Sequence, residues 1–203
     1  MDWVLGALPP APARVLEVGA GSGELAERMG EAGYSVVAID PAGEPPVVPM
    51  ALADLDAPAA SFDAAVAVLS LHHVEPLAPS VKRLAEVMRA GGLLAVDEID
   101  VAVFDLPAAE WLTARWREAG REVPKSPPEM VEMLQGHMHP LSRLLEALGE
   151  WFEIAEVERG PYLHRWHLDG SQLALEEELI ARGELPVTGA RFVGRRRAVP
   201  VDG

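Results

Sequence analysis

The most constraining feature of this chain is an apolar run that changes within five residues into a glycine-rich turn and then a helical pattern. The run Val15–Val18 leads into Gly19, Gly21 and Gly23, three glycines at alternate positions. Glycine lets the backbone take conformations that other residues avoid, and it lets a ligand lie directly against the main chain. The free N–H groups at the start of the following helix then face that ligand. The pattern predicts the first strand–helix turn of a nucleotide-binding α/β fold.

The spacing of the glycines and the nearby charges indicate the chemistry of the ligand. A dinucleotide fingerprint, G-x-G-x-x-G counted from Gly19, requires its third glycine at position 24, which is Glu24. Glu17 adds a second carboxylate two residues before the first glycine. A pyrophosphate would meet both carboxylates as like charges, whereas a ligand with a cationic end and no phosphate would be attracted. This favours S-adenosylmethionine, whose amino group and sulfonium are both positive.

Composition predicts one soluble domain that does not bind polyanions. A chain of 203 residues can bury a substantial core, and its net charge of −15 opposes binding to nucleic acid backbones and anionic membranes. We see no run of the roughly 18 apolar residues that a membrane span needs and no secretory leader. Cysteine is absent, which excludes disulfides and a thiolate nucleophile. We expect a cytoplasmic protein, and the excess of arginine over lysine indicates a GC-rich bacterial genome.

Apolar runs alternate with helical patterns along the chain. The connection 41–46 is too short and proline-rich for a full crossover helix. We expect Gly91-Gly92 to end the helix that contains Val81–Met88. Seven strands result. They are predicted at 14–18, 34–39, 47–52, 62–69, 93–98, 152–158 and 190–198, with further helices at 24–31, 108–119, 128–135, 141–148 and 171–182.

Residues 104–140 interrupt this alternation and form a helical insertion. They follow the carboxyl end of the fifth strand, which is the edge where open α/β sheets bind their ligands. Their two helical pieces are separated by a loop that contains Pro124 and the pair Pro127-Pro128. Only about 13 residues precede the first strand, so we expect the insertion to act as the lid of the pocket.

The chain resembles class I S-adenosylmethionine-dependent methyltransferases of the small-molecule group. The likeness covers residues 12–100 by motif and residues 141–198 by the order of elements. Glu17 and the three glycines match the first motif, and the stretch Arg89–Leu94 is similar to the turn into strand five. The resemblance implies an α/β, Rossmann-like, seven-stranded and mostly parallel sheet with helices on both faces. It also implies one methyltransferase domain over residues 1–203, with S-adenosyl-L-methionine as cofactor and a small molecule as methyl acceptor.

The resemblance also assigns residues to the cofactor. Asp40, at the end of the second strand, matches the acidic residue that binds both ribose hydroxyls. The residue that reaches the adenine amino group is Asp54 in one alignment and Ala51 in another. Ser61–Asp63, leading to Leu69–Val74, is similar to the fourth strand and the loop beside the methionine part. The implied cofactor contacts are Glu17, Gly19, Ala20, Gly21, Gly23, Asp40, Pro41, Asp54, Leu55, Leu69 and His72.

The six histidines occur in three close pairs, of which two are candidates for catalysis. With no cysteine and the pairs in separate elements, we predict no metal site. Methyl transfer to a hydroxyl or carbon acceptor needs a base, and histidine suits that role at neutral pH. The ordered candidates are His139, His137 and His73, with the first two expected to point the same way from a loop. His164 is expected on one face of an extended stretch with Tyr162 and Trp166.

Two other functions remain compatible with the sequence. A nicotinamide-dependent oxidoreductase is disfavoured by Glu24 and by the acidity of the turn. A non-catalytic or regulatory module could bind S-adenosylmethionine on the same fold. The acceptor and its reacting atom, the need for a base and the oligomeric state are not determined by the sequence. The run Arg195–Arg197 is expected to be a solvated, charge-balancing edge rather than an anion site.

Overall fold

The computed structural model of the chain describes residues 2–168 and 170–198, and these form two compact units. Unit 1 contains residues 2–98, 142–157 and 191–198, and unit 2 contains residues 99–141 and 158–190 except residue 169. Residues 1, 169 and 199–203 of the predicted single domain lie outside the described part. One domain over the whole chain stays a prediction.

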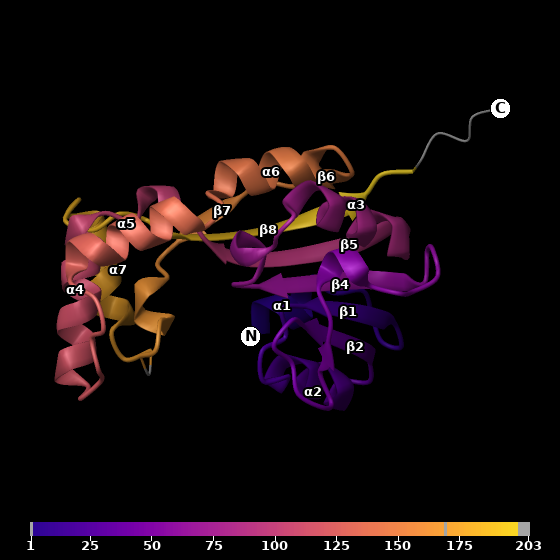
Figure 1. The fold of residues 1–203 in the computed structure, drawn as a ribbon, viewed down its shortest axis with the longest axis horizontal. Helices are drawn as coiled ribbons and strands as arrows, with labels where there is room; N and C mark the ends of the chain where they lie inside the picture. Colours follow the sequence, from indigo (N-terminus) through magenta and orange to yellow (C-terminus); the bar gives the residue numbers. More distant parts are fainter. Residues whose placement is uncertain (1, 169, 199–203) are drawn as a thin grey trace. The chain divides into compact units, whose positions relative to one another are not determined.

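The centre of the sheet is made of parallel strands (Figure 1), and most apolar side chains of β1 (Arg14–Val18) and β4 (Phe62–Val68) are buried. β1 pairs in parallel with β2 (Ser35–Asp40) on one side and with β4 on the other. β4 pairs in parallel with β5 (Met88–Ile99). The spatial order is β3-β2-β1-β4-β5-β8-β6. Parallel pairing brings the carboxyl ends of β1, β2 and β4 to one edge, and the predicted α/β fold is confirmed.

Helices cover both faces of this sheet, as the apolar composition of its strands predicts. On one face, α1 (Asp2–Ala7) and α2 (Glu24–Glu31) contribute Val4 and Met29 to a core cluster with residues of β1, β4 and β5. α3 (Leu77–Val87) and α6 (Leu141–Gly149) lie on the opposite side (Figure 1). The sequence predicts α2 and α6 closely, but α1 was not expected.

The described residues contain eight strands where seven were expected. The predicted strand at 152–158 is two strands, β6 (Phe152–Ile154) and β7 (Glu158–Gly160), and both pair with β8 (Gly189–Arg196). The division between the two units falls between β6 and β7, after residue 157. The predicted strand at 47–52 is reduced to β3 (Val48–Pro49), because proline cannot donate a ladder hydrogen bond. The 3₁₀ helix η1 (Leu52–Asp54) follows it.

The prediction that Gly91-Gly92 ends a helix is wrong. α3 ends at Val87, and both glycines lie inside β5. A Cβ on Gly92 would lie 2.9 Å from the carbonyl oxygen of Asp63 and 3.0 Å from that of Arg89. Glycine at this position therefore serves a close approach of backbone segments within the sheet.

Unit 2 contains the two helices expected in the insertion, α4 (Leu106–Glu118) and α5 (Pro127–His137), together with α7 (Leu173–Ala181). Aromatic side chains form much of its core. The indole Nε1 of Trp116 donates to the carbonyl oxygen of Trp166 at 2.8 Å, and the ring of the fully buried Phe104 lies 5.7 Å from that of Trp166. Within the described ranges, no helix combines the length and apolar character needed to cross a membrane.

The expected extended stretch with Tyr162, His164 and Trp166 on one face is wrong, because the chain forms the 3₁₀ helix η4 (Leu163–Arg165). The physical cause is the carboxylate of Glu176 on α7. It accepts hydrogen bonds from the backbone N–H groups of Tyr162, Leu163 and His164 at 2.7–2.8 Å. These three donors can reach one carboxylate only if the chain turns.

The run Arg195–Arg197 is only partly the solvated edge that was expected. Arg195 and Arg197 are exposed, but Arg196 is 6% exposed. Its Nε donates to the carbonyl oxygen of Ala85 at 2.6 Å, and Nη1 donates to the carbonyls of Trp151 and Arg197. Desolvation lowers the pKa of the Arg196 guanidinium. Its hydrogen bonds connect β8 to α3 and to the segment before β6.

We predict that Arg196→Lys lowers the free energy of unfolding by about 1–3 kcal/mol, because an ammonium cannot satisfy all of these separated carbonyls. Arg195→Lys is the matched control. The guanidinium of the exposed Arg195 donates to the carbonyl oxygen of Gly91, so its replacement should change stability by less than about 0.5 kcal/mol. Urea unfolding measures both variants, and equal effects would contradict the assignment.

Candidate ligand-binding pocket

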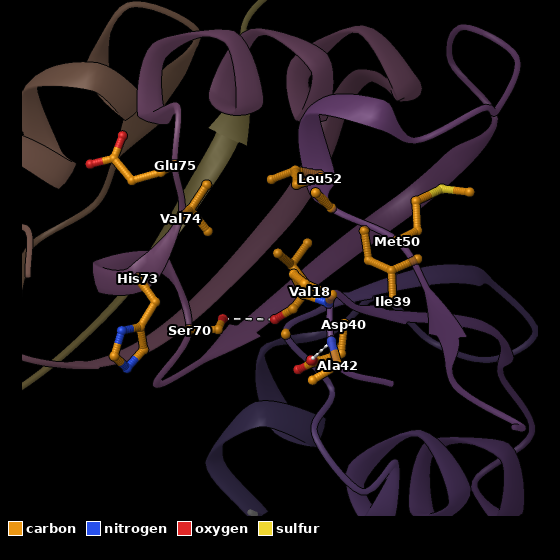
Figure 2. A pocket seen from close by; sticks show the side chains of 13 residues that line it. Val18, Ile39, Asp40, Ala42, Met50, Leu52, Ser70, His73, Val74 and Glu75 are labelled. Carbon is orange, nitrogen blue, oxygen red and sulfur yellow. Dashed lines mark hydrogen bonds between the residues drawn. The ribbon is translucent and has the colours of Figure 1, made fainter. Parts of the chain in front are cut away.

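A cavity of about 360 Å³ lies in unit 1 at the carboxyl ends of β1 and β2. This volume is in the range of pockets for small molecules and cofactors. Figure 2 shows that its walls come from four segments of the chain. They are the first glycine turn, the end of β2, the turn before η1 and the turn after β4. The lining residues are Val18, Gly19, Ile39, Asp40, Pro41, Ala42, Met50, Ala51, Leu52, Ser70, His73, Val74 and Glu75.

The glycine turn follows β1 and has the backbone conformation that the sequence predicts. Gly19, Gly21 and Gly23 have φ values of 70°, 53° and 81°. The N–H groups of Gly19 and Ala20 both donate to the carbonyl oxygen of Ile39, at 2.8 and 3.0 Å, which ties the turn to β2. A Cβ on Gly19 would lie 2.2 Å from the Cβ of Ser70, but a Cβ on Gly21 would meet nothing within 4 Å. Gly19 therefore permits tight packing, and Gly21 faces open space.

Asp40, the last residue of β2, lies in the pocket wall and braces the loops around it. One of its carboxylate oxygens accepts from the N–H of Gly21 at 3.0 Å, and the other accepts from the N–H of Ala42 at 2.9 Å. Each carboxylate oxygen has a further lone pair that can accept another donor. The geometry thus brings the predicted acidic residue to the predicted glycine turn.

Glu17 is buried in β1, with 4% of its surface exposed. Its Oε2 has no hydrogen-bond partner within residues 2–168 and 170–198. Desolvation raises the pKa of this carboxyl to about 7, and a hydrogen bond from the backbone of Ala26 opposes the shift. Buried acceptors are normally satisfied, so an unpartnered carboxylate oxygen marks a position that a donor can stabilise. Glu17 is not among the residues that line the cavity.

The histidines after β4 face different surroundings. His72 is buried, and its Nδ1 lies 2.6 Å from Oε2 of Glu98. His73 is exposed and lines the pocket, with its ring centroid 4.2 Å from that of His72. Burial, followed by the charge of His72, lowers the pKa of His73, while the charge of Glu98 opposes this change. Of the two, His73 is the one placed to contact a ligand in this cavity.

The remaining predicted site residues are not all brought to the cavity. Ala51 lines it, whereas Asp54 is exposed and Leu55 is buried, and neither of these two is a lining residue. The geometry therefore favours the alignment that uses Ala51. Ala20, Gly21 and Gly23 belong to the turn beside the cavity without lining it, and the same holds for Leu69 and His72 after β4. The role of each in binding a cofactor stays a prediction.

The expectation that His137 and His139 point the same way from a loop is wrong. His137 is the last residue of α5 and is exposed, with its Nδ1 3.1 Å from the carbonyl oxygen of Met133. His139 follows the helix and is 5% exposed. Both belong to unit 2, whereas the cavity belongs to unit 1. Their catalytic roles stay predictions.

Two residues that shape the cavity were not among the predicted cofactor contacts. Ser70 donates its hydroxyl to the carbonyl oxygen of Val18 at 2.7 Å, as Figure 2 shows. Glu98 is fully buried, and it accepts from the N–H groups of Ser70 and Leu71. The signal available in the sequence was an acidic residue at the carboxyl end of the fifth strand. Within the described residues, no group of three or more potential metal ligands is found.

Comparison with known proteins identifies the family. Residues 1–156 match the family model described as a methyltransferase domain, and the chain belongs to this family. It is 35% identical over 107 residues to an uncharacterized methyltransferase of Mycobacterium bovis, covering 47% of this chain and 42% of that protein. It is 33% identical over 118 residues to the ubiquinone biosynthesis O-methyltransferase of Xanthomonas axonopodis pv. citri, covering 49% of this chain and 48% of that protein. The chain spans less than half the length of these relatives.

Solved structures share the fold. An S-adenosylmethionine-dependent methyltransferase from Mesorhizobium loti superposes with a TM-score of 0.62 at 21% identity, covering 96% of both chains. The 1,6-didemethyltoxoflavin-N1-methyltransferase of Burkholderia thailandensis, solved with 1,6-didemethyltoxoflavin and S-adenosylhomocysteine, gives 0.54 at 19% identity, covering 97% of this chain and 75% of that one. The architecture is therefore the Rossmann-like fold of S-adenosylmethionine-dependent methyltransferases.

We predict opposite sensitivities for two glycines of the turn. Gly19→Ala should destabilise the protein by more than about 2 kcal/mol, because the new methyl group overlaps Ser70 and φ is positive. Gly21→Ala should cost only the backbone strain, about 1 kcal/mol, because its Cβ enters open space. Thermal and urea unfolding of the two variants provide the comparison. A Gly19→Ala protein as stable as Gly21→Ala would mean that Ser70 does not pack against this turn.

We also predict a pH dependence that arises from Glu17. Its pKa of about 7 in the folded protein exceeds the ordinary value of 4.5 for this carboxyl, so folding favours its protonated form. Stability from this group is complete below about pH 4.5 and is lost as the pH rises through 7. Stability curves of wild type and Glu17→Gln should therefore diverge between pH 4.5 and 7, with the variant gaining relative to wild type. Parallel curves would show that the pKa of Glu17 is not raised.

Proposed function

We propose that the chain is an S-adenosylmethionine-dependent methyltransferase that acts on a small-molecule acceptor. The observation that carries this proposal is the meeting of the glycine turn with Asp40 at the cavity of unit 1. Family membership supports methyl transfer, and the fold shared with the Mesorhizobium and Burkholderia proteins supports this cofactor. The Burkholderia protein carries a small molecule, which supports the acceptor class. A bacterial, cytoplasmic protein stays our prediction.

The residues of the cavity fit a cationic adenosyl ligand. The titratable lining residues are Asp40, Glu75 and His73, so the lining includes two carboxylates but no lysine or arginine. Among the described residues, nothing fills the space where a side chain of residue 21 would stand, and Oε2 of the buried Glu17 has no hydrogen-bond partner. In our proposal Asp40 accepts hydrogen bonds from the ribose hydroxyls, and the ligand lies against the main chain of the turn at Gly21. Glu17 stabilises the ammonium group of the ligand. Ala51 and Leu52 bound the adenine.

The chain itself then contributes alignment and shielding. S-adenosylmethionine supplies an activated methyl group and its leaving group, so a protein gains most by orienting the acceptor and excluding water. His73 has a lowered pKa and is therefore neutral at pH 7, which lets it accept a proton from a hydroxyl or carbon acceptor. His137 and His139 are the alternative bases. An amine acceptor that arrives uncharged needs none of them.

The lid role of residues 104–140 is part of this proposal. Phe104 and Trp116 of the insertion pack against Trp166 within unit 2, and α4 and α5 are joined by the segment 119–126. Such a segment can hinge a cover that closes over cofactor and acceptor together. The capping box at Ser126, in which Glu129 accepts from the Ser126 N–H, fixes where α5 begins.

The fold alone does not determine the reaction. The [4+2]-cyclase SpnF has the same fold, with a TM-score of 0.62 at 17% identity and coverage of 98% of this chain and 80% of that one. The fold therefore also occurs in a protein named for another reaction, and a non-catalytic or regulatory module that binds the cofactor is our alternative. A nicotinamide-dependent oxidoreductase is the weaker alternative, because Glu24 stands where a glycine is required.

We predict that the protein binds S-adenosylhomocysteine and that Asp40→Ala weakens this binding at least about tenfold, because two hydrogen bonds to a carboxylate are lost. Gly21→Val should abolish binding by occupying the open space. Titration calorimetry measures both, with urea unfolding as the control for folding. Unchanged affinity in folded Asp40→Ala would exclude the ribose assignment. Wild type that binds NADH but not S-adenosylhomocysteine would overturn the cofactor, and binding without turnover across acceptor panels would favour the regulatory module.

A further inference from the structure

The carboxylate of Glu98 holds three consecutive residues of the turn after β4. Glu98 lies near the carboxyl end of β5 and is completely buried. Its Oε1 accepts from the N–H groups of Ser70 and Leu71 at 2.9 and 2.7 Å. Its Oε2 lies 2.6 Å from Nδ1 of His72. Bonds of this kind to a charged acceptor in a buried place are strong and directional.

The turn that Glu98 holds forms one wall of the cavity. It begins at Leu69, which has a φ of 54°, a conformation that non-glycine residues adopt only when their surroundings enforce it. Ser70 then contacts the glycine turn through its hydroxyl bond to Val18, and its Cβ occupies the space beside Gly19. Ser70, His73 and Val74 are lining residues of the cavity (Figure 2). The position of this wall thus depends on the carboxylate behind it.

His72 extends the same arrangement to His73. Its ring is buried, bonded to Glu98, and tilted by 47° against the His73 ring at 4.2 Å. The ring of the exposed His73 therefore lies beside the His72 ring, which Glu98 holds in place. The sequence predicts His72 as a cofactor contact, but its burial and its bond to Glu98 give it a different place, behind the residues that line the cavity.

We propose that Glu98 and His72 are positioning residues that fix Ser70, His73 and Val74 as a preformed wall for the adenosyl ligand. The inference deepens the proposed function and rests on it. Neither residue touches the ligand in this arrangement. They act through the turn, which without Glu98 would leave the buried N–H groups of Ser70 and Leu71 unsatisfied and free to seek other partners.

The chain contains a matched control in unit 2. Glu176 is also completely buried, and its Oε1 accepts from the N–H groups of Tyr162 and Leu163, both at 2.8 Å. Its Oε2 accepts from the N–H of His164 at 2.7 Å and lies 2.8 Å from Nδ1 of the same histidine. The two carboxylates thus hold similar 3₁₀ turns, η2 (Leu71–His73) and η4, but only η2 includes a lining residue of the cavity.

The experiment compares Glu98→Gln with Glu176→Gln. Both should lower stability, because each loses a buried charge that accepts several hydrogen bonds. Only Glu98→Gln should weaken binding of S-adenosylhomocysteine, by about tenfold, since a displaced wall loses its fit to the ligand. Titration calorimetry and urea unfolding give these values for the full chain. Equal affinities in two folded variants would overturn the proposal.

A second measurement reports on His73 without any ligand. Histidine side-chain resonances are followed by NMR against pH and assigned with His73→Gln. Glu98→Gln should lower the pKa of His73, because the carboxylate charge raises it, whereas Glu176→Gln should leave it unchanged. Asp40 and Glu75 are the other charged residues that line the cavity. Both are present in each variant, so they do not account for a difference in the pKa of His73.

A third variant keeps the test decisive if Glu98→Gln does not fold. His72→Asn retains a donor for Glu98 but removes the ring beside His73, so it should raise the pKa of His73, because the charge of His72 lowers it. A His73 pKa that is the same in wild type and in every folded variant overturns the positioning role. If wild type does not bind S-adenosylhomocysteine, the proposed function fails, and the NMR titration still decides whether Glu98 and His72 control His73.

Discussion

The pocket depends on one close contact between two turns of the backbone. The turn after β1 meets the turn after β4 where Gly19 lacks a side chain and Ser70 fills the space, with a Cβ-to-Cβ distance of 2.2 Å for any residue larger than glycine. The Ser70 hydroxyl bonds to Val18 in the same place, and Glu98 holds Ser70 from behind. β2 joins through the carbonyl of Ile39. The carboxyl ends of the parallel strands β1, β2 and β4 thus lie at one cavity.

Charge defines what such a cavity can bind. Asp40 and Glu75 lie in its lining, and Glu17 is buried in the adjoining strand, with one oxygen that has no hydrogen-bond partner in the described part of the chain. The pKa of Glu17 is raised to about 7 because the interior disfavours its charge. A cation in this position reverses that preference, whereas a pyrophosphate would add to the repulsion. The carboxylates therefore favour a sulfonium ligand over a dinucleotide, although the backbone fold can accommodate both.

Most of the regular structure could be predicted from periodicity alone. β1, α2, β2, β4 and α6 lie within one or two residues of their predicted ranges, because each carries a clear apolar pattern that local and tertiary preferences share. The failures have a common physical origin. Gly91 and Gly92 lie within a strand, where the backbone of Asp63 comes too close to Gly92 for a side chain. The stretch from Tyr162 turns because its N–H groups donate to the carboxylate of Glu176. Contacts between segments distant in sequence decided both.

The same division applies to the site. The sequence by itself determined the glycine turn and Asp40, because a strand end, alternate glycines and an acidic residue after the next strand are local signals whose positions follow from parallel pairing. Only the tertiary structure decided that His73 rather than His72 lines the cavity, that Ala51 rather than Asp54 does so, and that Glu98 stands behind the wall. Glu98 is 28 residues from Ser70, and packing of β4 beside β5 brings them together. No pattern within a single element encodes which side chain meets which across that distance.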